Sequence, residues 1–484
     1  MSKARALTSL LIACAAGTAP GEPLLESAAD QSFDYSVIPK TVVDNAISLR
    51  EIALLDNLSV DIVESVTTEV GPRRMGTNGD KRAIAWAQEK FRELGFDRVW
   101  TEDVPLDRGW IRGEARAEIL APFPHDIVMT ALGYSVGTNG DLIGEIVEFP
   151  TFADLEAVPE GDSLKGKIVF ISYSMADYVP APGEPEWQNY SEGTKARSGG
   201  HVAAAKRGAE AIIIRSVGID NNRNGHTGSG YAYFDGVRKI PAAAVSAPDA
   251  MLMQNMLKRG KPVTLKMNMT SKITGPAMSA NIIGEITGRE DPDRFVVLGA
   301  HVDSWDEGTG AIDDGAGIGA VMAAAAFIGQ MEERPRRSVR VLLFAGEEIG
   351  FYGVKAYMDK HQDDIDSHLL GAEADSGTGR ANTLTSGVGE YALPIVHEMF
   401  KLIVPLGIAW NDANNAQAQS DMSVLSEAGM PALDFQQNPN DYFMYHHTPN
   451  DTFDKIDPED MRYLTAAYAT MFYLAAEMGV DFRQ

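Results

Sequence analysis

Two patterns of apolar and polar positions divide the chain. Over residues 41–104 apolar positions recur at helical spacing, most clearly in an amphipathic stretch over residues 82–94 that is closed by Gly95. Over residues 128–275 short strand-like runs alternate with long connections rich in Gly and Pro, which predicts an inserted α+β module. The strand-like runs are residues 143–149, 167–173 and 211–215, with a helix predicted over 201–208.

From residue 276 to the C-terminus, strands and helices alternate more regularly. The predicted strands are residues 295–300, 339–344, 369–374 and 431–435, and the predicted helices are 315–331, 390–402 and 458–478. Such alternation is typical of a mostly parallel sheet covered by helices on both faces. The sequence therefore predicts the α/β class, with an αβα sandwich around a mostly parallel central sheet.

Composition and charge narrow the function classes. Hydrophobic residues make up 44% and charged residues 23% of the 484, the usual balance of a soluble globular enzyme. The net charge of -26 argues against nucleic acid as a partner, because phosphate binding needs an excess of Lys and Arg. The acidity favours solubility, and part of it can gather around bound cations. No continuous apolar run approaches the roughly 18 residues of a membrane-spanning helix.

The N-terminus has the features of an export signal. Lys3 and Arg5 give it a positive start, residues 6–13 are apolar, and small residues follow. The single cysteine, Cys14, ends the string Leu-Ile-Ala-Cys, which resembles a bacterial lipobox. Both a plain secretory signal and a lipid anchor at Cys14 are consistent with this pattern. We therefore expect an exported protein that is periplasmic, secreted or anchored by lipid to a membrane surface.

Metal-binding side chains come directly after the predicted strands of the C-terminal half. In open α/β sheets, ligands bind beyond the carboxyl ends of the strands, so these side chains are expected at one sheet edge. The five segments carry His301 and Asp303, Asp313 and Asp314, Glu347 and Glu348, Asp375, and His446 and His447. Each pattern alone is weak, because adjacent acids usually form a solvated surface and a lone histidine is more often structural. Their joint placement is what indicates a functional site.

Close carboxylates repel one another in a partly dry site, so a cation is the natural way to hold them. Three carboxylates (Asp313, Glu348 and Asp375) and one hydroxide would balance two Zn²⁺ ions, with His301 and His447 as neutral ligands. Imidazole and carboxylate ligands with open positions suit catalytic zinc.

These strings are similar to a known family. The similarity is carried by Gly71-Pro72-Arg73, residues 301–306 and 310–315, Glu347-Glu348, residues 375–378, His446-His447 and Asp451-Thr452. They resemble the M28 family of zinc metallopeptidases over most of residues 45–475. Residues 165–169, 205–215 and 239–241 resemble the protease-associated domain that is inserted in such enzymes.

The resemblance implies two Zn²⁺ ions and a ligand set. His301 and Asp375 are expected to ligate different ions, Asp313 to bridge them, and Glu348 and His447 to complete the two sites. Asp303 is expected to orient the His301 ring.

Two choices within this set stay open in the sequence. Asp314 could take the place of Asp313, and His446 that of His447. The family pattern favours Asp313 and His447, which stand directly before Asp-Gly and Thr-Pro-Asn-Asp-Thr.

The resemblance also implies an activity. Glu347 is expected to act as general base, taking a proton from water and passing it to the leaving amine. The family cleaves peptides near a free terminus, so we expect an aminopeptidase or dipeptidase acting on short unblocked peptides. A di-zinc deacylase of the M20 type is the closest alternative, and a catalytically inactive binding protein is a more distant one. The resemblance further implies a homodimer.

Together these observations predict four segments. Residues 1–35 form a signal peptide and linker, and residues 36–127 the first part of the peptidase domain. Residues 128–275 form the protease-associated insert, and residues 276–484 the second part of the peptidase domain, which carries the metal site.

Overall fold

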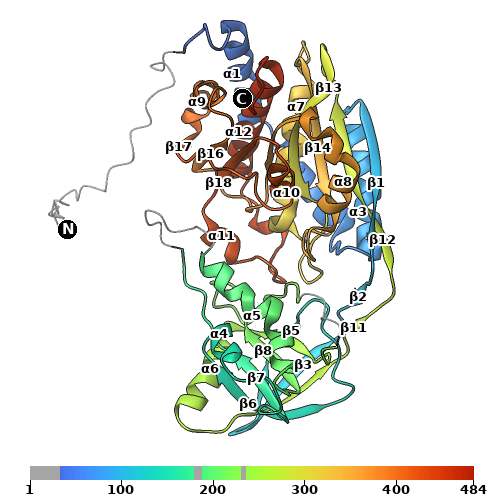
Figure 1. The fold of residues 1–484 in the computed structure, drawn as a ribbon, viewed down its shortest axis with the longest axis vertical. Helices are drawn as coiled ribbons and strands as arrows, with labels where there is room; N and C mark the ends of the chain where they lie inside the picture. Colours follow the sequence, from blue (N-terminus) through green and yellow to red (C-terminus); the bar gives the residue numbers. More distant parts are fainter. Residues whose placement is uncertain (1–32, 179–187, 231–235) are drawn as a thin grey trace, which may run out of the picture.

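The structure is a computed structural model that describes residues 33–178, 188–230 and 236–484. The expected export signal and Cys14 lie outside the described residues. Two sheets form two lobes along the long axis of the molecule, with helices α5 (Gln188–Ala205) and α11 (Pro439–Phe443) at the junction between them (Figure 1).

The first sheet has eight strands in the order β1-β12-β14-β13-β15-β18-β16-β17. Their bounds are β1 Arg98–Leu106, β12 Ala277–Ile286, β13 Asp291–His301, β14 Arg337–Phe344, β15 His368–Glu373, β16 Thr383–Gly387, β17 Ala409–Asn411 and β18 Ala432–Gln436. The four central strands, β14-β13-β15-β18, are parallel to one another. The pairs β1–β12, β12–β14 and β16–β18 are antiparallel. The α/β class is confirmed, and the parallel arrangement holds for the centre of a mixed sheet.

Helices cover both faces of this sheet. One face carries α1 (Lys40–Leu55), α2 (Leu58–Ser65), α3 (Asn78–Glu93), α7 (Ala316–Gly329), α9 (Leu393–Phe400) and α12 (Pro458–Glu477). The opposite face packs against α8 (Tyr352–His361) and α10 (Met422–Glu427).

Within the described parts of the chain, one helical segment, Ala311–Gly329, is long and apolar enough to cross a membrane, but its apolar window is entirely buried. A helix that is apolar all round belongs in a protein core, and α7 is the central helix of this one.

The second sheet also has eight strands, in the order β4-β3-β10-β6-β7-β8-β9-β5. They are β3 Ala115–Ala121, β4 His125–Ile127, β5 Met129–Ala131, β6 Leu142–Phe149, β7 Lys167–Ile171, β8 Ala211–Arg215, β9 Ala242–Val245 and β10 Thr264–Met269. Helices α4 (Phe152–Glu156), α5 and α6 (Ala247–Lys258) accompany it. The sheet begins earlier than residue 128, because β3 and β4 extend it beyond β10. The short pair β2 (Trp110–Ile111) and β11 (Lys272–Ile273) joins the two lobes.

Two segments differ from the prediction for physical reasons. The end of the region predicted as helical forms β1, an edge strand that is exposed over much of its length and therefore lacks a strong strand signal. Helix α5 begins at Gln188 rather than at residue 201. Gly193, Gly199 and Gly200 lower the helix propensity of the part before residue 201, but glycines fit the packing there: a Cβ at Gly193 or Gly200 would lie within 2.8 Å of Val217 or Ile212.

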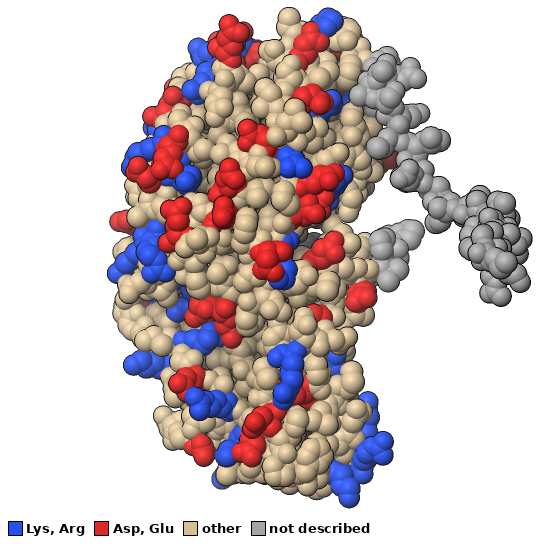
Figure 2. All heavy atoms as spheres, turned by 180° about the vertical axis from the view of Figure 1, so that it is seen from behind, with Lys and Arg blue, Asp and Glu red and all other residues tan. Residues whose placement is uncertain are grey.

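Surface charge is mixed on the face opposite to that of Figure 1. Figure 2 shows acidic and basic side chains interspersed there, without a large patch of one sign. Several acidic residues are instead buried in the interior, among them Asp303, Asp313, Asp314, Glu348 and Asp421. The acidic side chains that give the chain its negative charge therefore lie partly in the interior and partly on the surface.

Candidate metal centre

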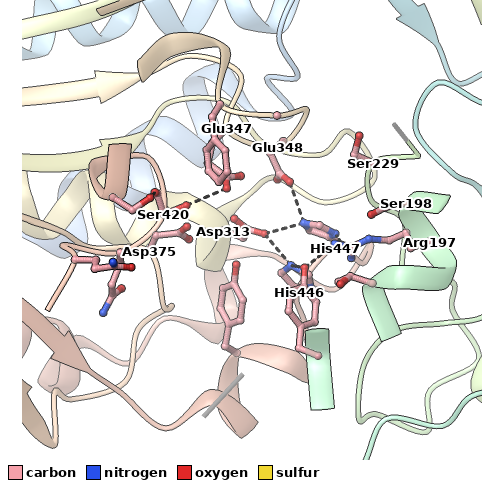
Figure 3. Close-up of a pocket in the computed structure, with 18 of the residues that line it drawn as sticks. Arg197, Ser198, Ser229, Asp313, Glu347, Glu348, Asp375, Ser420, His446 and His447 are labelled. Carbon is pink, nitrogen blue, oxygen red and sulfur yellow. Dashed lines mark hydrogen bonds and ion pairs between the residues drawn. The ribbon is translucent and has the colours of Figure 1, made fainter. Parts of the chain in front are cut away.

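The predicted site residues converge at the carboxyl edge of the first sheet. His301 ends β13, Glu347 and Glu348 come after β14, and Asp375 comes after β15. Asp313 lies in the segment before α7, and His447 lies in the loop after α11. A cavity of about 700 Å³ is lined by Glu347, Glu348, Asp313, Asp375, His446 and His447, and Figure 3 shows these side chains facing one another.

Asp313 belongs to two groups of side chains that could each hold a metal ion. One group is His301, Asp313 and Asp375, and the other is Asp313, His446 and His447, with ligand atoms in each group within 4.8 Å of one another. Asp313 Oδ1 lies 3.0 Å from His301 Nε2, and Asp313 Oδ2 lies 3.3 Å from His447 Nε2. One carboxylate thus faces both groups, as a bridging ligand must.

The structure separates Asp313 from Asp314. The carboxylate of Asp314 accepts hydrogen bonds from the main-chain N–H groups of His301 (3.1 Å) and Gly317 (3.0 Å). It therefore holds the backbone in place, whereas Asp313 points into the cavity. This geometry favours Asp313 as the candidate ligand.

The two adjacent histidines are less clearly separated. Their rings stack, with centroids 3.5 Å apart. His447 Nε2 lies nearer to Asp313 Oδ2 than His446 Nε2 does (3.3 against 3.7 Å), and it lies 2.9 Å from Glu348 Oε2. These contacts place Glu348 beside the second group, and they favour His447 over His446 as the candidate ligand.

Asp303 contacts the site through both its side chain and its main chain. Its carboxylate Oδ1 accepts hydrogen bonds from the main-chain N–H groups of Gly346 (2.8 Å) and Glu347 (3.2 Å). His301 Nδ1 lies 3.1 Å from the main-chain oxygen of Asp303 and 3.7 Å from its carboxylate. The main chain of Asp303 is therefore the nearer partner of the ring, while its side chain holds the start of the Glu347 segment.

Burial governs the protonation of the cluster. It raises the pKa of Glu347 to about 8, with the charge of His301 opposing and those of Asp375 and Glu348 adding to the rise. Burial, together with the charge of Asp313, also holds the pKa of Glu348 well above its usual value. Burial acts to raise the pKa of Asp313 too, but hydrogen bonds with His301 and His447 outweigh it and hold this pKa well below the usual value.

Such opposing shifts are typical of crowded, buried carboxylates. Asp375 Oδ1 is buried without a hydrogen-bond partner, which is costly unless a cation or a proton is close. Carboxylate oxygens and imidazole nitrogens are common zinc ligands, so the residues present fit such an ion.

Sequence reasoning missed the contribution of the second lobe. Arg197, on α5, lies with its Nη1 3.3 Å from His447 Nδ1 and donates from Nη2 to Tyr190 Oη at 2.6 Å. Thr227 donates its main-chain N–H to the carbonyl of His447 (2.9 Å), and its own carbonyl lies 3.3 Å from His447 Nδ1. No local motif marks these residues, because they act only through the packing of one lobe on the other.

It also missed Ser420, whose hydroxyl donates to Glu347 Oε1 at 2.9 Å. Ser420 has a positive φ, as do the two residues before it. This strained turn brings the hydroxyl to the cavity wall, and nothing in the local sequence indicates it.

A mixed α/β sandwich with imidazoles and carboxylates gathered at the carboxyl ends of its parallel strands defines a metal-dependent hydrolase. The model of "Peptidase family M28" matches residues 281–472, a range that includes all five candidate ligands. Human carboxypeptidase Q is 32% identical over 433 residues, covering 89% of this chain and 88% of the relative. The mouse protein of that name is 30% identical, covering 93% and 91%. The chain belongs to peptidase family M28.

Solved structures agree with this assignment. The peptidase M28 precursor of Shewanella amazonensis SB2B superposes with a TM-score of 0.87 at 43% identity, covering 92% of this chain and 98% of that one. The aminopeptidase of Aneurinibacillus sp. strain AM-1 has a TM-score of 0.61 at 20% identity, covering 89% and 96%, and supports the fold alone. The resemblance to M28 peptidases is thus confirmed, in preference to the M20 alternative.

Proposed function

We propose that this protein is a zinc-dependent exopeptidase that hydrolyses short unblocked peptides and holds two Zn²⁺ ions. The observation that carries the proposal is the position of Asp313, whose two carboxylate oxygens face two separate groups of candidate ligands beside Glu347. One group is His301, Asp313 and Asp375. The other is Asp313 and His447 with Glu348.

Each side chain then has a role. Zinc held by His301, Asp313, Glu348, Asp375 and His447 would lower the pKa of water and polarise the scissile carbonyl. Glu347 takes the proton from the attacking water and passes it to the leaving amine, which its position on the cavity wall and its hydrogen bond with Ser420 support. Asp303 holds the Glu347 main chain and, through its own carbonyl, the His301 ring.

The second lobe supplies the cationic wall of the cavity. Among the described residues that line the cavity, Arg197 is the single Lys or Arg. We propose that it faces the free carboxylate of a short peptide, because a guanidinium pairs well with a carboxylate. Such an anchor favours dipeptides over longer chains.

The remaining assignments are part of the same proposal. Residues 36–127 and 276–484 form the peptidase domain, except that β3 and β4 belong to the sheet of the second lobe. Residues 128–275 form a protease-associated domain, and residues 1–35 direct export. Cys14 is either a lipid-attachment site or an incidental residue of a secretory signal. The active protein is proposed to be a homodimer.

The test is hydrolysis of a panel of unblocked dipeptides and aminoacyl reporters by the purified protein, after chelation and after zinc is restored. Activity should disappear on chelation and return with zinc, and two zinc ions per chain should be measured.

Glu347→Gln should lower kcat by about 10²- to 10⁴-fold with zinc content unchanged, because the lost group moves a proton. The exposed Glu390→Gln is the control and should behave as wild type. A protein that binds zinc but cleaves none of the panel would refute the exopeptidase proposal, and one that binds no zinc would refute the metal centre.

A further inference from the structure

Arg73 is a fully buried arginine that the chemistry above does not use. It lies in the Gly71-Pro72-Arg73 string before α3, and its side chain has 0% exposure. Its guanidinium donates from Nε to the carbonyl of Val302 (2.6 Å), from Nη1 to that of Thr309 (2.8 Å) and from Nη2 to that of Gly310 (2.9 Å). Every nitrogen of the guanidinium thus bonds to one loop, residues 302–310.

That loop joins His301 to the Asp313 segment and contacts the metal centre along its length. Trp305 donates its main-chain N–H to Glu348 Oε1 at 3.2 Å. Asp303, on the same loop, accepts from the main chain of Glu347. A displacement of the loop would therefore move four candidate site residues, since His301 and Asp313 stand at its two ends.

The loop is built around the guanidinium. Gly310 has a φ of +64°, and a Cβ at this position would lie 2.6 Å from Arg73 Nη1. A residue with a side chain therefore does not fit here without a shift. The main-chain N–H of Arg73 also lies 3.3 Å from Ser304 Oγ, to which it donates.

Asp451 holds the other side of the same loop. Its carboxylate accepts from the main-chain N–H groups of Ile312 (2.6 Å) and Asp313 (3.3 Å), and its carbonyl accepts from Thr309 (2.8 Å). Arg73 interacts electrostatically with Asp451, Asp314 and Asp303. Arg73 thus holds loop 302–310, while Asp451 holds the end of this loop through its carbonyl and the following Asp313 segment through its carboxylate.

We propose that Arg73 is a positioning residue for zinc, which holds loop 302–310 so that His301 and Asp313 stand in place before the ion binds. The proposal rests on the metal centre of the proposed function. Two effects oppose each other here. The positive charge of Arg73 repels a divalent cation, whereas the fixed loop spares the cost of ordering the ligands at the moment of binding. We infer that the second effect dominates, because all three side-chain bonds of Arg73 go to this one loop.

A second buried arginine provides a matched control. Arg207 also donates to three main-chain carbonyls, those of Val158 (2.6 Å), Ala203 (2.8 Å) and Glu156 (2.7 Å), and is 6% exposed. Those partners all lie in the second lobe. Arg207 has the same bonding as Arg73 without the contact with the metal-centre loop.

The experiment measures zinc affinity by competition with a chromophoric chelator, together with thermal unfolding of the metal-free protein, for Arg73→Lys, Arg73→Met, Arg207→Lys and Arg207→Met. Lys keeps the charge but cannot reproduce the fork of three bonds. Both Arg73 variants should bind zinc about 10- to 100-fold more weakly, as is usual when a partner outside the ligand set is lost. Both Arg207 variants should unfold at lower temperature with zinc affinity unchanged.

Three outcomes would overturn the proposal: Arg73 variants that bind zinc like wild type, an Arg73→Met variant that binds more tightly, or Arg207 variants that lose as much affinity. Should the Arg73 variants fail to fold, hydrogen exchange of wild-type loop 302–310 decides. Protection already present without zinc supports the proposal, and protection that arises only with zinc overturns it. A wild-type protein without zinc affinity would instead refute the proposed function.

Discussion

The two sheets share a core geometry and differ in the residues that come after their strands. Each contains four consecutive parallel strands, β14-β13-β15-β18 in the first and β6-β7-β8-β9 in the second. In the second sheet three of these strands end at serines with structural partners. Ser172 donates to Glu148, Ser216 to the carbonyl of Val245, and Ser246 to Asp249.

In the first sheet the corresponding edge holds carboxylate oxygens that are buried without a hydrogen-bond partner, on Asp303, Glu373, Asp375 and Asp421. Both edges have the position at which α/β proteins bind ligands. The comparison teaches that position at a strand end is not sufficient. Buried carboxylates whose bonding capacity is unused distinguish the edge that can hold metal.

The largest expected effect comes from removing the shared carboxylate. Asp313→Ala should lower kcat/KM by at least about three orders of magnitude and reduce the zinc content, because metal catalysis supplies several kcal/mol. The measurements are peptide hydrolysis and metal analysis. Ser216→Ala is the counterpart in the second sheet: it should cost about 1 kcal/mol of stability and leave activity unchanged. If Asp313→Ala stayed active, the distinction between the two edges would fail.

A smaller effect is expected where the second lobe touches the cavity. Arg197→Met should raise KM for unblocked dipeptides about tenfold or more, because a charged hydrogen bond contributes about 1.5–3 kcal/mol. Aminoacyl reporters without a carboxylate should be affected much less, and Arg197→Lys should recover part of the loss. Equal effects on both substrate types would show that Arg197 supports His447 rather than the peptide.

The smallest effect concerns the amino end of the first sheet. At the start of β15, His368 Nε2 lies 2.9 Å from Tyr357 Oη, and burial, aided by the charge of Arg340, lowers the pKa of His368 to about 3. The unfolded state takes up a proton near pH 6.5 and the folded state does not. The free energy of unfolding should therefore fall as the pH drops below 6.5, by about 2 kcal/mol at pH 5.

His368→Asn removes this titration, so the slope of stability between pH 7 and pH 5 should become shallower while kcat per folded molecule stays the same. Denaturant unfolding at several pH values measures the slope. An identical slope in wild type and variant would show that His368 does not cause this pH dependence of stability.

The candidate ligands of the site were more readily predicted than the residues that hold these ligands in place. Ligand types that come after buried strands are visible in sequence, so His301, Glu348 and Asp375 could be named from local pattern and family resemblance. The choice of Asp313 over Asp314 depends on which carboxylate bonds to the main chain, which is a tertiary property. Edge strand β1 was missed because half-exposed strands carry a weak pattern.

Support from the second lobe was not predictable at all from local sequence. Arg197 and Thr227 reach His447 only because α5 and the loop after β8 pack against the first lobe. The glycine-containing start of α5 hid even the helix that carries Arg197. Contacts between segments far apart in the chain, rather than any motif, determine this wall of the cavity.

The pair of contacts between Thr227 and His447 has a consequence for how the protein can be divided. A candidate ligand in one lobe is clasped by the main chain of the other, through both its carbonyl and its ring. The residues needed for activity therefore extend beyond the lobe that contains the first sheet and include part of the second lobe. A shortened chain that keeps every ligand but lacks the second lobe would be a scaffold with a misaligned histidine, and not a minimal enzyme.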